Sequence, residues 1–481
     1  MEEKSLKDKT FSGLSWTVFD KLFQNGFVLV VGILLARIID KDNYGLMAAL
    51  VIFTAVANIL HESGFTTALI RKKNVTLSDY TTVFYINISI GIFLYLLLFF
   101  LAPLISAFNE KPILTPLARF LFLSFLFNSF AVVQNARLIK QINYKLITKI
   151  NTVSIFISYS IALAMAYSGF GVWALATQIV IWTFAKMCGL WIFGKWRPSG
   201  GFSKESFKDL FNFSSKLLLG SLLNAVMVNL PQSLIAKIYS FDIGGLYNQA
   251  YKNYNSANEI LNGSVYSVSF PILSTVHEDS KLKSAFRKFI RIKALIIFPM
   301  FMGIILVAKP FISLLGEQWS DAVPVLQLLC IGGIFAGLET ANGDTLRIKG
   351  KSDKILMLTI FQSVLIALSI AIPYIFNLHY LYYIGGLSLT YILKYIYSSI
   401  VSNKLIDYKI SELGKDLFPY FIISLFCTGC GYFLQFLISN SIVLLISQII
   451  FVGLLYIGIL YLSGSKILKE AIDYIKKKPI R

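Results

Sequence analysis

The sequence has few charged side chains for its length. Asp, Glu, Lys and Arg make up 14% of its 481 residues, whereas hydrophobic residues make up 56%. An ordinary soluble domain carries roughly 25% charged residues. A soluble fold of this composition would lack the polar side chains needed to cover its surface. The scarcity of charge therefore excludes a chain of soluble domains, although the length would suit about three of them.

Residues that bind metals or form disulfides are also scarce, with four cysteines and three histidines. Cys427 and Cys430 have CxxC spacing, but they fall inside an apolar run without polar ligands, which favours buried thiols over redox or metal chemistry. The first eleven residues lack the apolar core of a signal peptide, so we expect no cleaved leader. We expect no metal site, no cofactor and no catalytic residue.

Long apolar runs are what the sequence has in abundance. Many of them approach twenty residues, enough to cross a hydrocarbon layer of about 30 Å as a helix. Read against turn and charge signals, they predict an all-α membrane protein with about fourteen transmembrane helices. The expected ranges are 13–38, 44–69, 81–106, 113–135, 147–168, 171–193, 217–239, 244–273, 294–315, 322–346, 355–376, 380–402, 417–437 and 441–463.

The net charge of +19 is explained by the placement of the basic residues. With the N-terminus in the cytoplasm, 34 Lys and Arg residues fall in the cytoplasmic connections and termini. The opposite side holds only Arg37, Lys41, Lys111, Lys237 and Lys309. This split predicts cytoplasmic N- and C-termini and basic loops that lie against anionic lipid headgroups. Because no basic soluble module is present, we expect no nucleic-acid partner.

Two segments match without gaps at a spacing of 200 residues. Residues 34–47 and 234–247 share Leu, Ala, Ile, Asp, Gly and Leu at six equivalent positions. Six predicted helices separate the two copies, which indicates a parallel repeat of two six-helix lobes, a common plan in transporters. We expect an N-lobe over 1–200, a C-lobe over 201–403, and two extra helices with a basic cytoplasmic tail over 404–481.

A series of short motifs follows the chain in a fixed order. They are Leu35-Ala-Arg37, Tyr44-Gly45, Ser63-Gly-Phe65, Ala68-Leu-Ile70, Gly169-Phe-Gly-Val-Trp-Ala-Leu175, Phe270-Pro271, Gly316-Glu-Gln-Trp319, Asn342-Gly343 and Lys349-Gly-Lys351. With these motifs and its helix count, the sequence resembles the polysaccharide (O-antigen and exopolysaccharide) flippases of the multidrug/oligosaccharidyl-lipid/polysaccharide exporter superfamily. The match is to the branch with fourteen helices.

The resemblance implies a function and a place in the cell. It implies transport of a polyprenyl-diphosphate-linked oligosaccharide across the bacterial cytoplasmic (inner) membrane, by alternating access, for polysaccharide or lipopolysaccharide biosynthesis. It implies a carrier that catalyses no reaction, which we expect to work as a monomer among membrane lipids. It also implies a cavity lined by helices 1, 2, 7 and 8.

The predicted helix 244–273 is unusually polar for a membrane span. Asn248, Lys252, Asn255, Ser256, Glu259 and Asn262 recur at steps of three and four, which puts them on one face. A polar face of this kind does not suit lipid, so we expect it to line a water-filled cavity or to form hydrogen bonds with another helix. Its repeat partner, 44–69, carries Asn58 and Glu62.

These residues supply the candidate site. The candidates for binding the substrate are Lys252, Asn255, Glu259, Asn248, Lys21 and Asn58. The candidates for coupling to a proton or sodium ion are Glu62, Glu259, Glu339 and Asp20. In this hypothesis Lys252, with Lys21, attracts the diphosphate, although Lys21 equally suits a lysine that extends toward the membrane surface.

Other polar positions have a structural explanation. Lys394 lies near the centre of a predicted span and requires a partner, for which Glu339 or another acid would serve. Asp344 is near a helix end, where a solvated cap is the plain interpretation. Gly333 and Gly337 have the GxxxG spacing that favours close helix packing.

Two other classes of function remain open. The first is a cation-coupled multidrug exporter on the same fold, which would favour twelve helices and an acidic cavity without lysines. The second is a membrane saccharide polymerase or ligase. The short outer loops, none longer than about a dozen residues, and the internal repeat both oppose an enzyme.

Overall fold

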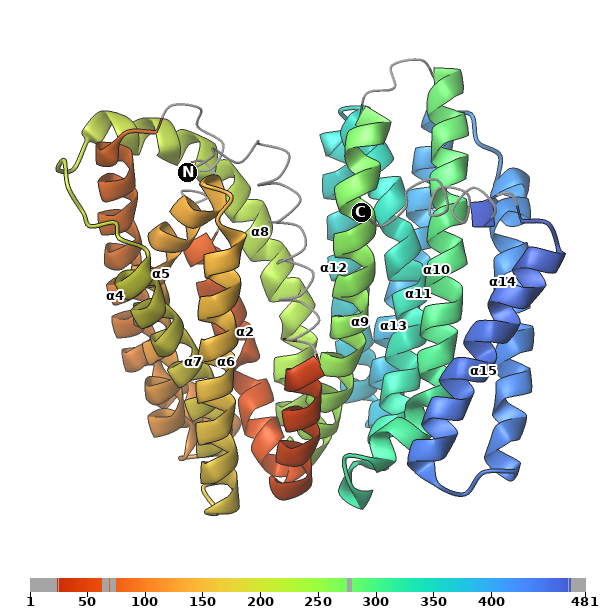
Figure 1. Cartoon of the computed structure of the whole chain (residues 1–481), viewed down its shortest axis with the longest axis horizontal. Coiled ribbons are helices and arrows are strands. Elements are labelled where there is room, and N and C mark those ends of the chain that lie inside the picture. Colours follow the sequence, from red (N-terminus) through yellow and green to blue (C-terminus); the bar gives the residue numbers. More distant parts are fainter. Residues whose placement is uncertain are drawn as a thin grey trace, which may run out of the picture. The chain divides into compact units, whose positions relative to one another are not determined.

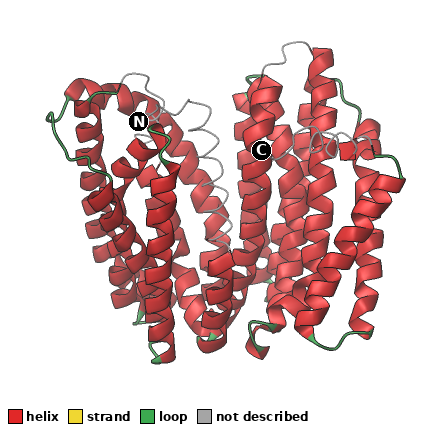
Figure 2. Cartoon of the chain, in the orientation of Figure 1, coloured by secondary structure: helices red, strands yellow, loops and turns green. Residues whose placement is uncertain are grey.

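The computed structural model describes residues 24, 26–62, 69, 75–274, 279–465 and 467–468. All regular structure among these residues is helical, and none of them forms a strand (Figure 2). Each of the fourteen predicted spans coincides with a helix within the described residues. The predicted all-α membrane fold is therefore confirmed.

The chain divides into two compact units, Met1–Gly245 and Leu246–Arg481 (Figure 1). The helices of unit 1 are a segment over 26–38, α2 (Lys41–Glu62), α4 (Leu77–Asn109), α5 (Leu114–Lys140), α6 (Tyr144–Tyr167), α7 (Val172–Phe193) and α8 (Lys204–Ile238). Unit 2 comprises most of α9 (Phe241–Ser274), α10 (Asp279–Ser313), α11 (Ala322–Ile348), α12 (Ser352–Ile375), α13 (Tyr380–Leu405), α14 (Ile410–Phe433) and α15 (Ser441–Leu462), with short 3-10 turns at Glu317–Trp319 and Leu434–Phe436. The lobe boundaries expected from the sequence remain a prediction.

Eleven described helices are long and apolar enough to cross a membrane. Two further apolar helical stretches, Gly26–Ile38 and the Leu222–Ile238 part of α8, supplement them among the described residues. The long helix α9 is not among these thirteen. Its polar residues lower its hydropathy, so other parts of the protein have to keep those residues away from lipid.

Unit 1 is built from closely packed helix pairs with buried apolar side chains between them. The closest packing is between α4 and α5, α6 and α7, α5 and α7, and α2 and α8. Phe84, Trp196 and Val133 are at the centre of one cluster, where the rings of Phe84 and Trp196 meet edge to face. Aromatic pairs of this geometry add to the packing energy gained from burial alone.

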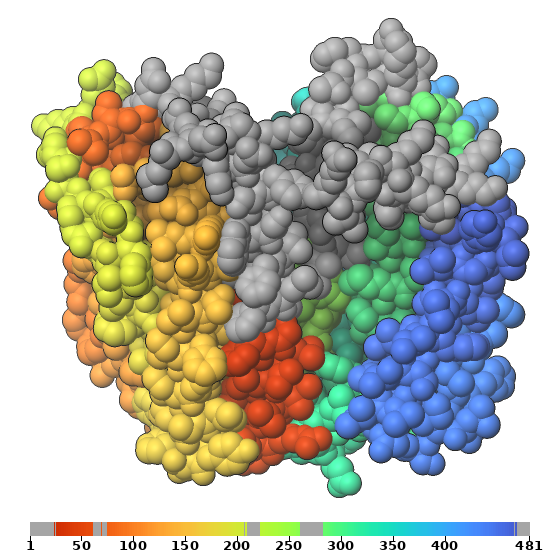
Figure 3. All heavy atoms as spheres, in the orientation of Figure 1, coloured from red at the N-terminus to blue at the C-terminus, as the bar shows by residue number. Residues whose placement is uncertain are grey.

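Unit 2 combines a central pair of helices with an outer pair. The helices α11 and α13 pack closely, α10 packs on α11, and α14 and α15 both pack on α10. The space-filling view shows α15 (blue) as an outer face, and its large apolar side chains, among them Ile446, Ile450 and Leu454, are more than half exposed (Figure 3). An apolar face of this size suits contact with lipid tails.

Polar residues next to the apolar runs set the helix ends. Thr76 and Asp79 form a reciprocal capping box at the start of α4, with bonds of 2.9 and 3.1 Å between each side chain and the other residue's backbone N–H. Asn440 accepts the backbone N–H groups of Ile442 and Val443 at the start of α15. Such caps satisfy N–H groups that the helix itself leaves unpaired.

The helices extend further into the basic connections than the sequence predicts. The segment between 273 and 294 was expected to be a cytoplasmic connection, but α10 begins at Asp279. Lys293, counted with that connection, is only 4% exposed and donates hydrogen bonds to the Gly337 carbonyl and the Thr340 hydroxyl of α11. The placement of Lys293 in a loop is therefore wrong. Two hydrogen-bond acceptors on α11 take the place of water around its ammonium group.

The two copies of the repeated turn contact each other. A Cβ atom on Gly45 would lie 1.9 Å from the carbonyl oxygen of Phe241, and one on Gly245 would lie 2.0 Å from that of Lys41. Positions 41 and 241, like 45 and 245, are equivalent in the repeat, so the contact is reciprocal. A reciprocal contact between equivalent residues is what a twofold relation produces, and it supports the repeat.

Candidate functional site

The tyrosines of α9 anchor the helix to unit 2. Tyr247 and Tyr254 are almost fully buried, and Tyr251 between them contacts both rings. Tyr254 also meets Phe301 of α10 and lies against Gly333 of α11, where a Cβ atom would be 2.5 Å from its ring. The GxxxG spacing is thus used for close packing, as predicted. Because these tyrosines recur at helical spacing, they fix which face of α9 turns outward.

The predicted polar face of α9 is exposed. The side chains of Lys252, Ser256 and Glu259 are open, while Asn255 is partly buried and donates a hydrogen bond of 2.8 Å to Oε1 of Glu259. Ser256 donates to the backbone carbonyl of Lys252. The sequence thus placed these residues on one face correctly. For Lys252, Asn255, Ser256 and Glu259, the structure gives no side-chain hydrogen bond to another described helix.

Lys252 has no charged or hydrogen-bonding partner for its ammonium group among the described residues. Its ammonium group forms no ion pair or hydrogen bond with any residue that the structure describes, and Glu259 accepts from Asn255 instead. The sequence predicts that Lys252 and Glu259, two turns apart, do not pair directly, and the structure agrees. An exposed ammonium on a membrane helix can bind an anion without first breaking an internal ion pair.

The other members of the candidate group are placed less fully. Asn58 of α2 is exposed, and Asn248 of α9 is partly buried. Asp20, Lys21 and the side chain of Glu62 lie outside the described residues, as does the side chain of Asn262. Their assignment to the site therefore stays a prediction.

Glu339 pairs with Lys394, as the sequence predicts for a lysine in the middle of a span. The two charged groups are 3.6 Å apart, and their side chains are 15% and 19% exposed. The pair joins α11 to α13 within unit 2. A cation that binds the Glu339 carboxylate has to compete with the Lys394 ammonium for it.

A second polar cluster beside this pair was not anticipated. Asp344 is 1% exposed, so the expected solvated cap is wrong. Its Oδ1 accepts a hydrogen bond of 2.8 Å from Arg347, while Oδ2 has no hydrogen-bond partner among the described residues. Lys293 interacts electrostatically with both Asp344 and Glu339. Spacing along one helix cannot reveal this cluster, because α10 brings Lys293 to residues about fifty positions away.

Three of the basic residues expected on the outer side meet around the repeated turn. Lys41 lies 3.7 Å from Asp242, Lys237 donates a hydrogen bond to Glu110, and the Lys111 ammonium lies 5.0 Å from the centre of the Phe241 ring. The Lys237 hydrogen bond and charge hold the pKa of the Glu110 carboxyl below its usual value. These contacts place the three cations at the same end of unit 1.

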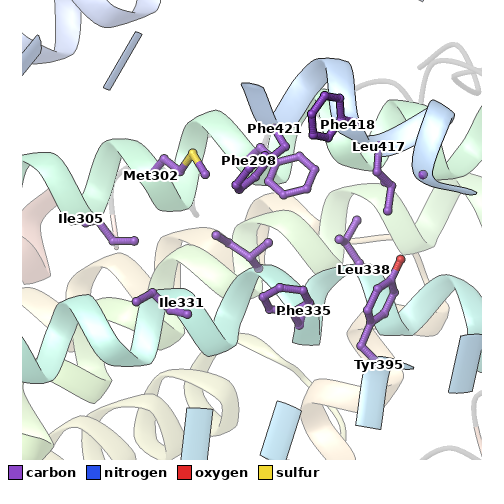
Figure 4. A pocket seen from close by; sticks show the side chains of 12 residues that line it. Phe298, Met302, Ile305, Ile331, Phe335, Leu338, Tyr395, Leu417, Phe418 and Phe421 are labelled. Atoms are coloured by element: carbon purple, nitrogen blue, oxygen red, sulfur yellow. The ribbon is translucent and has the colours of Figure 1, made fainter. Parts of the chain in front are cut away.

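The cavity inside unit 2 is apolar. It has a volume of about 360 Å³ and lies among α10, α11, α13 and α14 (Figure 4). Phe298, Phe335 and Phe421 contribute rings from three of these helices, and their side chains point into the common space. None of the predicted site residues that the structure describes lines it. A diphosphate or a sugar would lose its hydration in such a cavity without compensation, so the polar face of α9 remains the better candidate.

Comparison with protein families gives a match over most of the chain. The profile described as "Polysaccharide biosynthesis protein" matches residues 34–324. The lipopolysaccharide biosynthesis protein WzxC of Escherichia coli K12 is 28% identical over 376 residues, which is 76% of each chain. The succinoglycan biosynthesis transport protein ExoT of Rhizobium meliloti is 24% identical over 330 residues, 68% of this chain and 67% of the relative.

Solved structures share the fold. The lipid II flippase MurJ, in an inward closed conformation, has a TM-score of 0.74 at 14% identity, with 96% of this chain and 100% of that chain covered. An inward-facing multidrug transporter of the MATE family has a TM-score of 0.64 at 16% identity, with coverage of 80% and 94%. At these identities the likeness concerns the fold alone.

Proposed function

Because this chain belongs to the family of polysaccharide biosynthesis proteins, we propose that it carries a polyprenyl-diphosphate-linked oligosaccharide from the inner to the outer leaflet of the bacterial cytoplasmic membrane. The names of its relatives support a role in supplying polysaccharide precursors. The fold that it shares with a lipid II flippase supports a cargo of this kind. The protein is a carrier and not an enzyme.

The observation that carries the proposal is the exposed ammonium of Lys252 on the polar face of α9, which pairs with none of the residues that the structure describes. A diphosphate cannot cross hydrocarbon alone, since an unpaired charge costs tens of kcal/mol there by Born estimates. A hydrated polar face with a free cation removes most of that cost. Asn248, Asn255 and Glu259 offer hydrogen bonds to sugar hydroxyls, while the polyprenyl chain stays in the lipid.

The direction of transport follows from the charge of the cargo. A membrane potential that is negative inside drives an anion outward by about 2.3 kcal/mol per charge for each 100 mV. A diphosphate therefore gains free energy on moving to the outer leaflet. Coupling to a proton or sodium ion would add to this gain. The candidates for binding that ion are Glu259 and Glu339, whose side chains the structure describes, and Glu62 and Asp20, whose side chains lie outside the described residues.

Alternating access requires that one end of the carrier closes while the other opens. We assign closure of the outer end to the reciprocal contact of Gly45 and Gly245, supported by the Lys41–Asp242 ion pair. These contacts would have to separate when the carrier opens outward. In this arrangement both termini are cytoplasmic, and one copy of the chain suffices.

Transport of one defined lipid-linked oligosaccharide in proteoliposomes tests the proposal. The lipid carries a sugar that an external oxidase can label only in the outer leaflet. We expect the purified protein to increase the labelled fraction, and a potential that is negative inside to increase the rate further. No increase over empty liposomes, with protein shown to be inserted, would overturn the proposal.

The same preparation separates the two alternatives. A multidrug exporter would accumulate a fluorescent organic cation in a proton or sodium gradient, which the MATE-like fold would permit. A polymerase or ligase would lengthen or transfer the sugar chain, which mass spectrometry of the recovered lipid would detect. We expect neither activity.

A further inference from the structure

A second pocket, with polar residues in its wall, lies in unit 2 where α10, α14 and α15 meet, away from α9. Its volume is about 310 Å³. Arg291 comes from α10, Lys415, Asp416 and Tyr420 come from α14, and Ser465 follows α15. All three helices pack against one another, and α14 and α15 lie outside the internal repeat. The proposed transport site makes no use of this pocket.

The carboxylate in the wall of the pocket is already satisfied. Asp416 is 1% exposed and accepts two hydrogen bonds from Arg287, at 2.8 and 3.0 Å. Arg291 donates its Nε–H to Oδ1 at 2.7 Å, and the Tyr408 hydroxyl donates to Oδ2 at 2.7 Å. With two guanidinium groups and a hydroxyl around it, Asp416 has neither free charge nor free lone pairs to repel an anion.

Among the residues that the structure describes, the cluster around Asp416 contains more cations than carboxylates. The basic groups are Lys283, Arg287, Arg291 and Lys415, and the acidic groups are Glu412 and Asp416. Lys283 and Arg287 pair with Glu412 at 2.9 and 3.2 Å. Arg291 and Lys415 thus carry the positive excess, and they are the two that line the pocket.

Both of these cations have N–H donors that bond to no residue that the structure describes. The Arg291 side chain is 40% exposed, and its Nη1 donates to no residue that the structure describes. Lys415 is exposed and forms no ion pair within the described chain. The hydroxyls of Tyr420 and Ser465 lie in the same wall. This combination of a guanidinium, an ammonium and hydroxyls is typical of sites that bind phosphate.

The remaining wall is apolar and continues into the lipid-facing surface. Pro419, Ile423 and Leu460 line the pocket, and on the same two helices Phe426 and Leu462 are 57% and 85% exposed. An inorganic phosphate ion has no apolar part that could pack against such a surface. An amphiphile with a charged head and apolar chains matches both parts.

We propose that this pocket binds the phosphate headgroup of an anionic glycerophospholipid whose acyl chains lie along α14 and α15. The Arg291 guanidinium and the Lys415 ammonium hold the phosphate, as in other basic pockets between transmembrane helices. The bound lipid joins α10 to the two helices outside the repeat. The site is separate from the cargo site on α9 and holds a lipid that is not transported.

Native mass spectrometry of the full-length protein, titrated with phosphatidylglycerol or phosphatidylcholine, tests the site. We expect one phosphatidylglycerol to bind more tightly than any phosphatidylcholine. Lys415→Gln should weaken its binding about fivefold, the effect of one basic residue near a headgroup. Lys404→Gln is the matched control, because Lys404 is also exposed, lies at the end of α13 and forms no ion pair among the described residues.

The outcomes are distinguishable. Equal binding of the two lipids, or wild-type binding by Lys415→Gln at an unchanged melting temperature, would overturn the proposal. A matching loss in Lys404→Gln would reduce the site to general surface charge and would also overturn it. Excess inorganic phosphate that raises the melting temperature as much as phosphatidylglycerol would assign the pocket to a free ion. Ser465→Ala, which keeps both cations, should show a smaller loss.

Discussion

The second helices of the two repeat copies, α2 and α9, occupy equivalent places in the repeat but differ in the polarity of their side chains. At four equivalent positions α2 carries Ala48, Ile52, Ala55 and Ile59, where α9 carries Asn248, Lys252, Asn255 and Glu259. The start of both helices keeps its Asp, Gly and Leu. The reciprocal contact of Gly45 and Gly245 needs both copies, so it constrains the start of both helices. At the four positions named above, by contrast, only α9 carries polar groups.

The largest effect is expected where the two copies are still alike. Gly245→Ala would place a Cβ atom 2.0 Å from the Lys41 carbonyl oxygen, and Gly45→Ala would do the same against Phe241. Because only backbone can move to relieve this overlap, we expect each to cost about 1–3 kcal/mol of stability. Thermal unfolding of the purified variants measures the loss. Gly385→Ala on α13, with no atom within 4 Å of its new Cβ, is the control.

The next test makes α9 resemble α2. Lys252→Ile installs the residue found at the equivalent position of the first copy. We expect transport of the lipid-linked oligosaccharide to fall at least tenfold, which corresponds to about 1.4 kcal/mol of lost interaction with the diphosphate. Lys252→Arg should keep most of the activity. Normal transport by the isoleucine variant, at equal protein level, would remove Lys252 from the mechanism.

A third test concerns the Glu339–Lys394 ion pair, which lies in unit 2 outside α9. Glu339→Gln removes the carboxylate that faces Lys394 and leaves the lysine unpaired in the membrane. We expect about 1 kcal/mol of lost stability, since the pair is partly exposed, and partial recovery in the double variant Glu339→Gln with Lys394→Gln. If Glu339 binds the coupled ion, the rate of transport in Glu339→Gln should no longer respond to a proton or sodium gradient. A gradient response equal to that of the wild type would exclude Glu339 as the coupling site.

The smallest effect on stability is expected at the equivalent positions 37 and 237, where both copies of the repeat carry a basic residue. Lys237→Gln removes the donor that lowers the Glu110 pKa from 4.5. A lowered carboxyl pKa stabilises the fold above pH 4.5, and that contribution is lost as the pH falls through the lowered value. The variant should therefore melt slightly below the wild type at neutral pH. The difference should vanish in acid; a difference that grows on acidification would contradict this account.

The sequence predicted most of the fold because apolar runs and turns are local signals. The fourteen spans were found, and the ends of α11 and α15 were placed within two residues. The starts of α10 and α14 were placed too late, since basic residues there were assigned to loops although they continue the helix. Charge alone does not end a helix when long side chains can reach the water.

The candidate site could be predicted only in part, for a related reason. The shared face of Lys252, Asn255 and Glu259 follows from helical periodicity, and the Glu339–Lys394 pair follows from the cost of a lone charge in the membrane. The burial of Lys293 beside Asp344 depends on how α10 packs on α11. No spacing within either helix carries that information.

The arrangement around Asp416 also has a consequence for how the chain is made. Arg287 and its partner Asp416 are 129 residues apart. At a translation rate of roughly 5–20 residues per second, the arginine leaves the ribosome on the order of ten seconds before its partner is synthesised. During that interval water and headgroups must solvate it, and α10 completes its docking only when α14 is inserted. A nascent chain stopped after α13 would therefore leave Arg287 and Arg291 without their carboxylate partners on α14.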